Sequence, residues 1–135
     1  MRNFLLAILL AAALPLHADI GEGKWEMEIT TSMPGTPAGA ATAKQAQCLR
    51  GEDARDPAKL FGSPGAGCEF TDRRDDGSTY RFRISCSGAA SLSGSGEMRY
   101  SRDALEGEIV LRLNDGTKNI ETRTAIRARR TGPCT

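Results

Sequence analysis

The sequence predicts an all-β domain: a curved antiparallel meander, or a barrel-like sheet, of about seven strands with one short helix. In residues 19–135, apolar and polar residues alternate with a period of two in most segments. Clusters rich in Gly, Asp, Ser and Asn separate these segments, as turns separate the strands of a meander. Only residues 51–61 have a composition that suits a helix. These three observations together predict a single sheet.

Residues 1–18 have the pattern of a signal peptide. Arg2 precedes an apolar run at residues 4–14, and Ala18 provides a small residue at the expected cleavage point. The uncharged stretch is short for a helix that spans a bilayer, so a membrane anchor is the less favoured alternative. We therefore expect residues 19–135 to form a single β domain that is periplasmic or secreted, with no transmembrane span after cleavage.

Cleavage would change the inventory of chemically active residues. It removes His17, the only histidine, and it removes Arg2, so that 17 of the 18 Lys and Arg remain beside 17 Asp and Glu. A neutral domain is not expected to bind nucleic acid. Without imidazole there is no Ser-His or Cys-His pair and no histidine metal ligand. We expect no enzyme, no cofactor and no metal, although chemistry based on carboxylates, Lys or Tyr stays open.

The first half of the domain predicts two strands and the short helix. Trp25, Met27 and Ile29 alternate with polar neighbours, as in a strand with one face in water. Further along we expect a loop at residues 32–43 and a second strand at residues 42–49. One or two helical turns, interrupted by Pro57, are expected at residues 51–61, and another loop at residues 62–67.

Four cysteines remain in the domain, and an oxidising compartment makes two disulfides the default expectation. Folding the chain about Gly77 places Cys68 directly opposite Cys86 on adjacent antiparallel strands, close enough for a disulfide. The second disulfide would then join Cys48 to Cys134. Four cysteines allow three pairings. A zinc site of four thiolates is the less favoured alternative, because no two cysteines form a C-x-x-C pair.

Three further turns predict the register of the remaining strands. They are a three-residue loop at residues 87–89, a turn at residues 102–103, and a hairpin at Asp115-Gly116, a dipeptide typical of tight hairpins. The expected partners are Ile84–Leu92, Phe82–Gly94, Tyr80–Gly96, Tyr100–Leu105, Met98–Gly107, Leu111–Ile120, Ile109–Thr122 and Leu105–Ile126. The parity of these positions places all of them on one face of the sheet.

The two faces of the sheet are expected to differ in chemistry. The apolar face must be buried, and its three glycines, Gly94, Gly96 and Gly107, would let the sheet bend. The opposite face carries Arg81, Arg83, Glu106, Glu108, Arg112, Glu121, Arg123, Arg127 and Arg129. Glu106 and Glu108 have the spacing of paired acids, but a solvated ion pair between Glu108 and Arg123 is the better explanation. The basic residues 123–130 are interpreted as a charged edge strand, with a surface for a partner or for anionic headgroups as the alternative.

Four aromatic residues are the candidate ligand-binding site. Trp25, Tyr80, Phe82 and Tyr100 fall on the apolar face, where they would line a cavity for a small apolar ligand. For Trp25, a role as a buried core residue is the simpler alternative. No catalytic residue and no metal ligand is assigned.

Several landmarks resemble a known family when their order and spacing are taken together. After the leader they are Gly23-Lys24-Trp25-Glu26, Met33-Pro34-Gly35, Cys48-Leu49, Cys68, Cys86, Gly94-Ser95-Gly96, Tyr100, Gly107 and Gly132-Pro133-Cys134. In these features residues 19–135 resemble a family of small secreted proteins of Gram-negative bacteria, number 3617 in the series of domains of unknown function. The resemblance implies export. It transfers no catalytic residue.

These observations lead to two functional hypotheses. The first is an exported, non-catalytic β protein that binds a small apolar ligand or an envelope protein. The alternative is a structural or stress-related envelope protein that acts through contacts of its edge strands.

Overall fold

Strands make up most of the chain, as the sequence predicts. The computed structural model describes residues 19–35, 39–62, 64–87 and 91–135, and the expected signal peptide lies outside them. The strands are β1 (Gly23–Ser32), β2 (Ala40–Leu49), β3 (Cys68–Asp75), β4 (Thr79–Cys86), β5 (Ser91–Tyr100), β6 (Ala104–Asn114) and β7 (Asn119–Gly132). The helical region consists of a 3-10 turn, η1 (Gly51–Arg55), and a single-turn helix, α1 (Ala58–Phe61).

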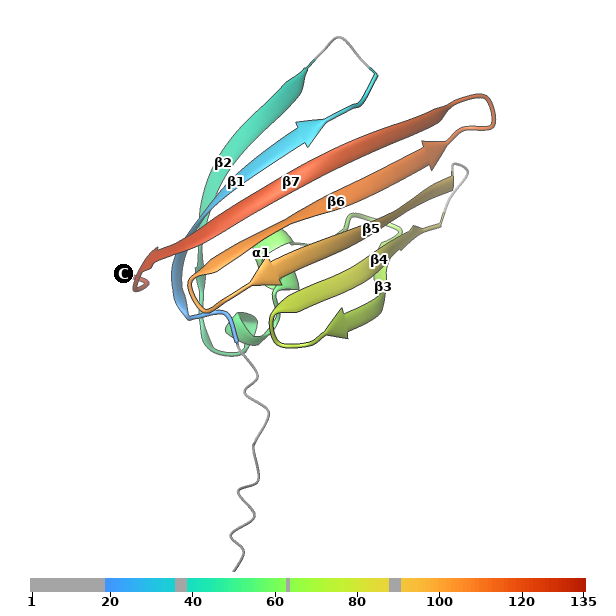
Figure 1. Ribbon diagram of the computed structural model, residues 1–135. Coiled ribbons are helices and arrows are strands. Elements are labelled where there is room, and N and C mark those ends of the chain that lie inside the picture. The colour runs from blue at the N-terminus through green and yellow to red at the C-terminus, as the bar shows by residue number, and fades with distance from the viewer. Residues whose placement is uncertain (1–18, 36–38, 63, 88–90) are drawn as a thin grey trace, which may run out of the picture.

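All strands pair antiparallel in one seven-stranded sheet with the order β2-β1-β7-β6-β5-β4-β3. The last strand, β7, lies between β1 and β6 (Figure 1). The β1–β2 hairpin therefore extends the sheet beyond the last strand of the β3–β7 meander. The sheet is curved but does not close into a barrel, and β2 and β3 form its two edges (Figure 1). In the described part of the chain, no helix is long and apolar enough to cross a membrane.

The predicted disulfides are both present. Cys68 lies opposite Cys86 in the β3–β4 register, and their Cα atoms are 4.0 Å apart. The second disulfide joins Cys48 on β2 to Cys134 beyond the end of β7, with the Cα atoms 5.8 Å apart. One bond therefore ties the β3 edge to its neighbour, and the other ties the opposite edge to the C-terminal segment.

The β4–β5 register differs from the prediction by two residues. Phe82 lies opposite Gly96 and not Gly94, Tyr80 lies opposite Met98 and not Gly96, and Ile84 lies opposite Gly94 and not Leu92. The connection between Cys86 and Ser91 is longer than the three-residue loop that we expected, and its residues 88–90 lie outside the described chain. A shift of two preserves which face each side chain occupies.

The β6–β7 register is also shifted by two. Leu111 lies opposite Thr122, Ile109 opposite Thr124 and Leu105 opposite Ala128, in place of the partners Ile120, Thr122 and Ile126. The connection is a four-residue loop and not a tight Asp-Gly hairpin: the N–H of Asp115 donates to the carbonyl of Lys118 at 3.3 Å.

The side chain of Asp115 favours this longer loop. Its Oδ1 accepts hydrogen bonds from the backbone N–H of Thr117 at 3.0 Å and of Lys118 at 2.8 Å. These bonds lower the pKa of the Asp115 carboxyl below its usual range. Asp76 closes the β3–β4 loop in the same way, through the N–H groups of Ser78 and Thr79. By contrast, the two-residue turn between β5 and β6 has the predicted register.

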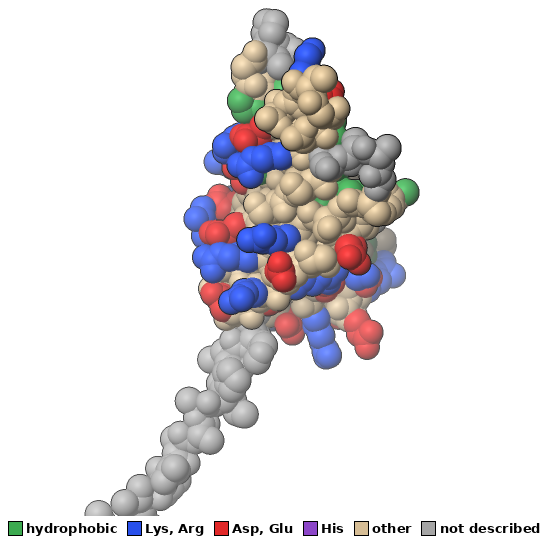
Figure 2. All heavy atoms as spheres, turned by 90° about the vertical axis from the view of Figure 1, so that its right-hand side faces the viewer, with side chains coloured by type: hydrophobic (Ala, Val, Ile, Leu, Met, Phe, Trp, Pro, Cys, Tyr) green, Lys and Arg blue, Asp and Glu red, His purple; other side chains and the backbone are tan. Residues whose placement is uncertain are grey.

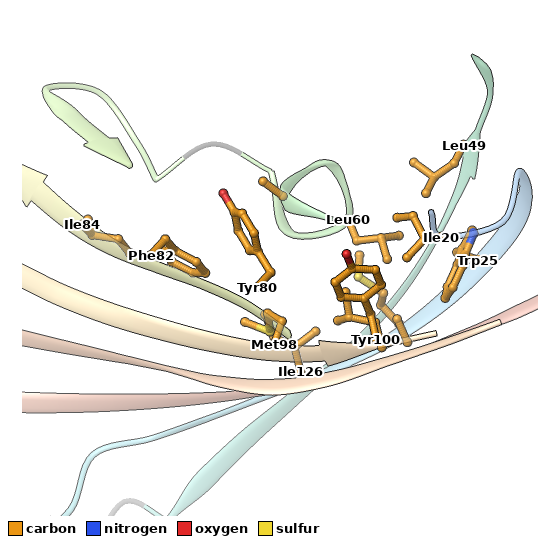
Figure 3. Close-up of a cluster of buried hydrophobic side chains, with 14 residues drawn as sticks. Ile20, Trp25, Leu49, Leu60, Tyr80, Phe82, Ile84, Met98, Tyr100 and Ile126 are labelled. Atoms are coloured by element: carbon orange, nitrogen blue, oxygen red, sulfur yellow. The ribbon is translucent and has the colours of Figure 1, made fainter. Parts of the chain in front are cut away.

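The core lies on the concave inner face of the sheet, and Figure 3 shows the strands curving around it. The buried cluster comprises Ile20, Trp25, Met27, Leu49, Ala58, Leu60, Tyr80, Phe82, Ile84, Met98, Tyr100, Leu105, Ile126 and Ala128. Ala58 and Leu60 belong to the helical segment 51–61, which covers this part of the sheet (Figure 3). The side-chain amide of Gln47 donates to the carbonyl of Lys59 at 2.8 Å and holds the segment against β2.

Candidate functional site

The four aromatic residues predicted to line a cavity lie inside the core. Trp25, Phe82, Tyr80 and Tyr100 are 0%, 2%, 4% and 8% exposed, and Figure 3 shows them on the inner face of the sheet. The indole N–H of Trp25 donates to the carbonyl of Gly21 at 2.9 Å, which fixes the segment before β1. Ligand binding by these four side chains stays a prediction, since a ligand could reach them only by displacing residues that now cover them.

The pairing of an aromatic ring with a strand glycine is present, with a different partner. A Cβ atom added to Gly96 would overlap the Phe82 ring, so the ring occupies the space that the glycine leaves. Phe82 also contacts Phe70 edge-on, with the ring centroids 4.9 Å apart. The glycine therefore allows an aromatic cluster to pack against β4 and β5, near the β3 edge of the sheet.

Both tyrosines of the chain have a raised phenol pKa. For Tyr100 the main cause is burial, followed by the hydrogen bond that its hydroxyl donates to Asp75 at 2.5 Å. Burial is also the main cause of the raised pKa of Tyr80. The ordinary pKa of tyrosine is 10.0. Just above that pH, the folded protein therefore retains the two phenol protons, whereas the unfolded chain releases them.

This difference predicts a loss of stability at alkaline pH. The tyrosine contribution is fully present below pH 10.0, the ordinary value, and declines as the pH rises above it, because the unfolded state then binds fewer protons. Urea unfolding at a series of pH values tests this, with Tyr100→Phe as the variant that should lose less stability. Tyrosinate absorbance at the ordinary pKa in the native protein would contradict it.

The inner face is only partly covered. Towards the β1–β2, β4–β5 and β6–β7 connections, aliphatic side chains on this face are half-buried and extend beyond the covering segment. We call this surface the distal inner face; it consists of Ile29, Leu92, Ile109, Leu111, Leu113 and Ile120. Ile29, Ile109 and Leu111 pack against the buried core, whereas Ile120 is 38% exposed. Threonines lie among them, and the hydroxyls of Thr31 and Thr124 are 3.3 Å apart.

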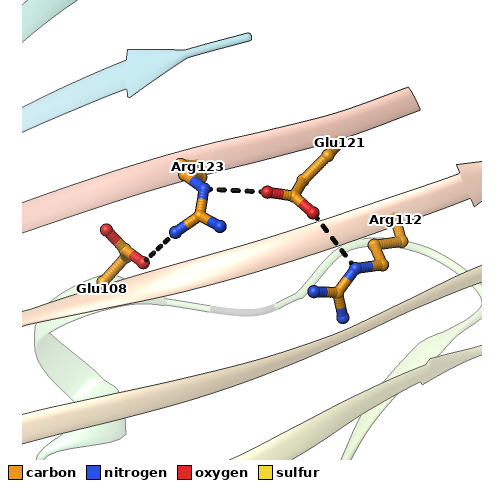
Figure 4. A network of polar contacts seen from close by, with 4 residues as sticks. All are labelled: Glu108, Arg112, Glu121 and Arg123. Carbon is orange, nitrogen blue, oxygen red and sulfur yellow. Dashed lines mark hydrogen bonds and ion pairs between the residues drawn. The ribbon is translucent and has the colours of Figure 1, made fainter. Parts of the chain in front are cut away.

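The outer face is charged and largely self-neutralised. Arg112, Glu121, Arg123 and Glu108 form a chain of ion pairs across β6 and β7, with N–O distances of 3.2, 2.8 and 3.1 Å (Figure 4). Burial opposes ionisation of Glu121, but the two arginines outweigh it and lower the pKa of this carboxyl. The predicted pairing of Glu108 with Arg123 is confirmed, although the two residues are diagonal neighbours and not directly opposite.

A hollow on the outer face has a volume of about 1130 Å³ and is lined by side chains of both signs. Its central row crosses five strands with alternating charge: Lys44, Glu28, Arg127, Glu106 and Arg99. Lys44 lies 3.8 Å from Glu28, and Arg99 lies 3.5 Å from Glu106. Figure 2 shows the same mixing of acidic and basic side chains from the end of the sheet. Such alternation favours a solvated surface over a site for one charged ligand.

One interpretation of the charged residues was wrong, and another agrees with the structure. The basic residues 123–130 lie on β7, which is flanked by β1 and β6, so the interpretation as an edge strand was wrong. The strand order brings the last strand next to the first, and no local pattern signals this. Glu106 and Glu108 are both exposed and each pairs with an arginine, which is the solvated arrangement we expected.

Among the described residues, no group of three or more acidic, cysteine or histidine side chains is arranged to hold a metal ion. Asp75 and Asp76, in the most acidic turn, are engaged as acceptors. Asp75 accepts from Tyr100 and from the N–H of Gly77 at 2.9 Å, and Asp76 closes its own loop.

Fold and surface together define a small, disulfide-linked, all-β protein with an open sheet and one apolar face that is only partly covered. Residues 20–134 match the family described as protein of unknown function (DUF3617), and the chain belongs to that family. No curated protein and no solved structure matches the chain.

The candidate ligand site predicted from the sequence consists of aromatic residues that the structure places in the buried core, and ligand binding by them stays a prediction. Large aromatic residues are also those that gain most from complete burial. The half-exposed aliphatic positions, such as Ile109 and Leu111, fell on the predicted apolar face without being singled out. Their alternation along β6 was visible in the sequence. The extent of the cover was not, because it depends on where the helical segment 51–61 packs.

Proposed function

We propose that this chain is an exported, non-catalytic protein that binds a small apolar ligand on the distal inner face. The observation that carries the proposal is the incomplete cover of an apolar sheet face. Ile29, Ile109 and Leu111 contact the core on one side and solvent on the other. An apolar ligand that covered them would gain about 25 cal/mol for each Å² of apolar surface removed from water.

Other features support export and the absence of catalysis. Two disulfides fit an oxidising compartment, and the leader pattern of residues 1–18 fits passage into one. The carboxylates with catalytic spacing, Glu106 and Glu108, lie in exposed ion pairs away from the apolar face. Cell fractionation tests export: we expect the chain in the periplasm or medium with Asp19 as its first residue, and a cytosolic chain that retains Met1 would contradict this.

Binding is tested with a fluorescent fatty-acid analogue as the apolar probe. Leu111 and Val110 are adjacent on β6 and face opposite sides of the sheet, so they provide a matched pair of variants. Leu111→Gln should weaken binding about tenfold, because it removes one apolar contact and places an amide on the surface. Val110→Gln should leave the affinity unchanged.

Two outcomes would contradict the proposal. One is the absence of saturable binding by the disulfide-bonded wild-type protein. The other is an equal effect of the two variants, which would show that the probe does not discriminate between the faces. Circular dichroism of both variants controls for loss of the fold.

A further inference from the structure

The two edges of the open sheet are built differently. β3 has a register shift between Thr71 and Arg74, and Asp72 at this point has a φ of 48°. Five of its eight residues are charged: Glu69, Asp72, Arg73, Arg74 and Asp75. A bulge and a high density of charge are the features that keep an edge strand from pairing with another chain.

β2 lacks these features. It pairs with β1 over all ten residues without a register shift, and its other side has no partner strand in the described chain. It contains no proline, and Lys44 is its only charged residue. Residues 40–46 are exposed and have small or unbranched side chains, so its backbone is accessible along the outer margin of the sheet (Figure 1). A long, regular and weakly charged edge is a template for another strand.

We propose that β2 pairs antiparallel with β2 of a second copy of this chain, so that one sheet continues through a two-fold symmetric dimer. The symmetry requires each residue and its partner to lie on the same face, which leaves only registers centred on a residue of β2. Edge-strand contacts were the alternative function that the sequence suggested. In the dimer these contacts are made by the β2 edge, and the partner is a second copy of the chain. Apolar-ligand binding does not depend on them.

The charges on and beside β2 select one register. A register centred on Lys44 would place the two lysines against each other, which is unfavourable. With Gln45 on the axis, Lys44 lies opposite Ala46 of the second copy. In the β1–β2 register Ala46 lies next to Glu26, so Lys44 of one copy would face Glu26 of the other across a small side chain.

This separation suits an ion pair. Two strand spacings amount to about 10 Å between Cα atoms, which extended Lys and Glu side chains can bridge. Glu26 is exposed and forms no ion pair with another described residue. The symmetric dimer would contain this pair twice. A register centred on Ala43 would instead place Lys44 opposite Thr42, which pairs with Thr30, so no carboxylate would be within reach.

Sedimentation velocity of the disulfide-bonded chain over a range of concentrations tests the proposal. The wild type should form a reversible dimer. Lys44→Glu should raise the dimer dissociation constant about tenfold, because two ion pairs become two repulsions. Glu26→Lys should do the same, and the double charge swap should restore dimerisation to within about threefold of the wild type.

Glu69→Lys is the control, because it makes the same charge change as Glu26→Lys but on the β3 edge. It should not alter the dimer dissociation constant. Circular dichroism and a thiol assay confirm that each variant is folded and oxidised. A wild-type chain that stays monomeric at its highest soluble concentration would overturn the proposal, and so would a dimer that the double swap fails to restore. Neither result affects apolar-ligand binding, which uses a different surface.

Discussion

Replacing Cys48 and Cys134 by serine is expected to lower the free energy of unfolding by about 4 kcal/mol. The disulfide closes a loop with a sequence separation of 86 residues, so its loss frees most of the domain in the unfolded state. It also releases the C-terminal segment from the β2 edge. Urea denaturation of the double variant, with well-defined folded and unfolded baselines, measures this change in the free energy of unfolding.

The second disulfide provides the matched comparison. Cys68 and Cys86 are separated by only 18 residues, so their replacement by serine should cost about 1 kcal/mol less. Because these cysteines also lie opposite each other on paired strands, the hairpin register should survive their loss. Equal effects of the two replacements, or a larger effect of the shorter loop, would contradict the assignment of the long loop as the stronger constraint.

Gly107→Ala is expected to destabilise the protein by about 3 kcal/mol. A Cβ atom at Gly107 would overlap the backbone carbonyl of Glu97 and would approach the Cα atom of Met98 to 2.8 Å. Met98 is fully buried, so any shift of its side chain disturbs the packing of the core. The substitution therefore forces β5 and β6 apart, and thermal or urea unfolding detects the loss.

Gly132→Ala is the control for this substitution. Nothing lies within 4 Å of a Cβ atom added at Gly132, and its backbone does not need a positive φ. We expect a change within about 0.5 kcal/mol, as for ordinary surface positions. If Gly107→Ala were as mild as Gly132→Ala, the close approach of β5 and β6 would be wrong.

The sequence predicted the faces of the sheet better than it predicted the registers. Tyr100 and Leu105 are opposite each other as expected, because the turn between them has only two residues and no competing side-chain cap. At Asp115-Gly116 the same reasoning failed by two residues, because the Asp115 carboxylate binds two backbone N–H groups and stabilises a longer loop. Both register errors amounted to two residues, an even number, so each side chain stayed on its predicted face of the sheet.

Long-range contacts were harder to predict. The pairing of β1 with β7 brings Met27 next to Ala128, more than a hundred residues further along the chain, and no turn signal connects them. For the same reason the basic strand was assigned to an edge. The extent of the candidate site depends on another long-range contact, the packing of Leu60 against the buried core of the sheet. The periodicity of the strands does not encode this contact.

A methyl NMR titration shows whether a fatty acid binds to the distal inner face, because it reports on each part of the inner face separately. We expect saturable shifts of the Ile29, Ile109 and Leu111 methyl groups, with the methyl groups of Ile20 and Leu60, which are buried in the core, unchanged. Shifts confined to Val110 on the outer face, or no shifts at any ligand concentration, would contradict it.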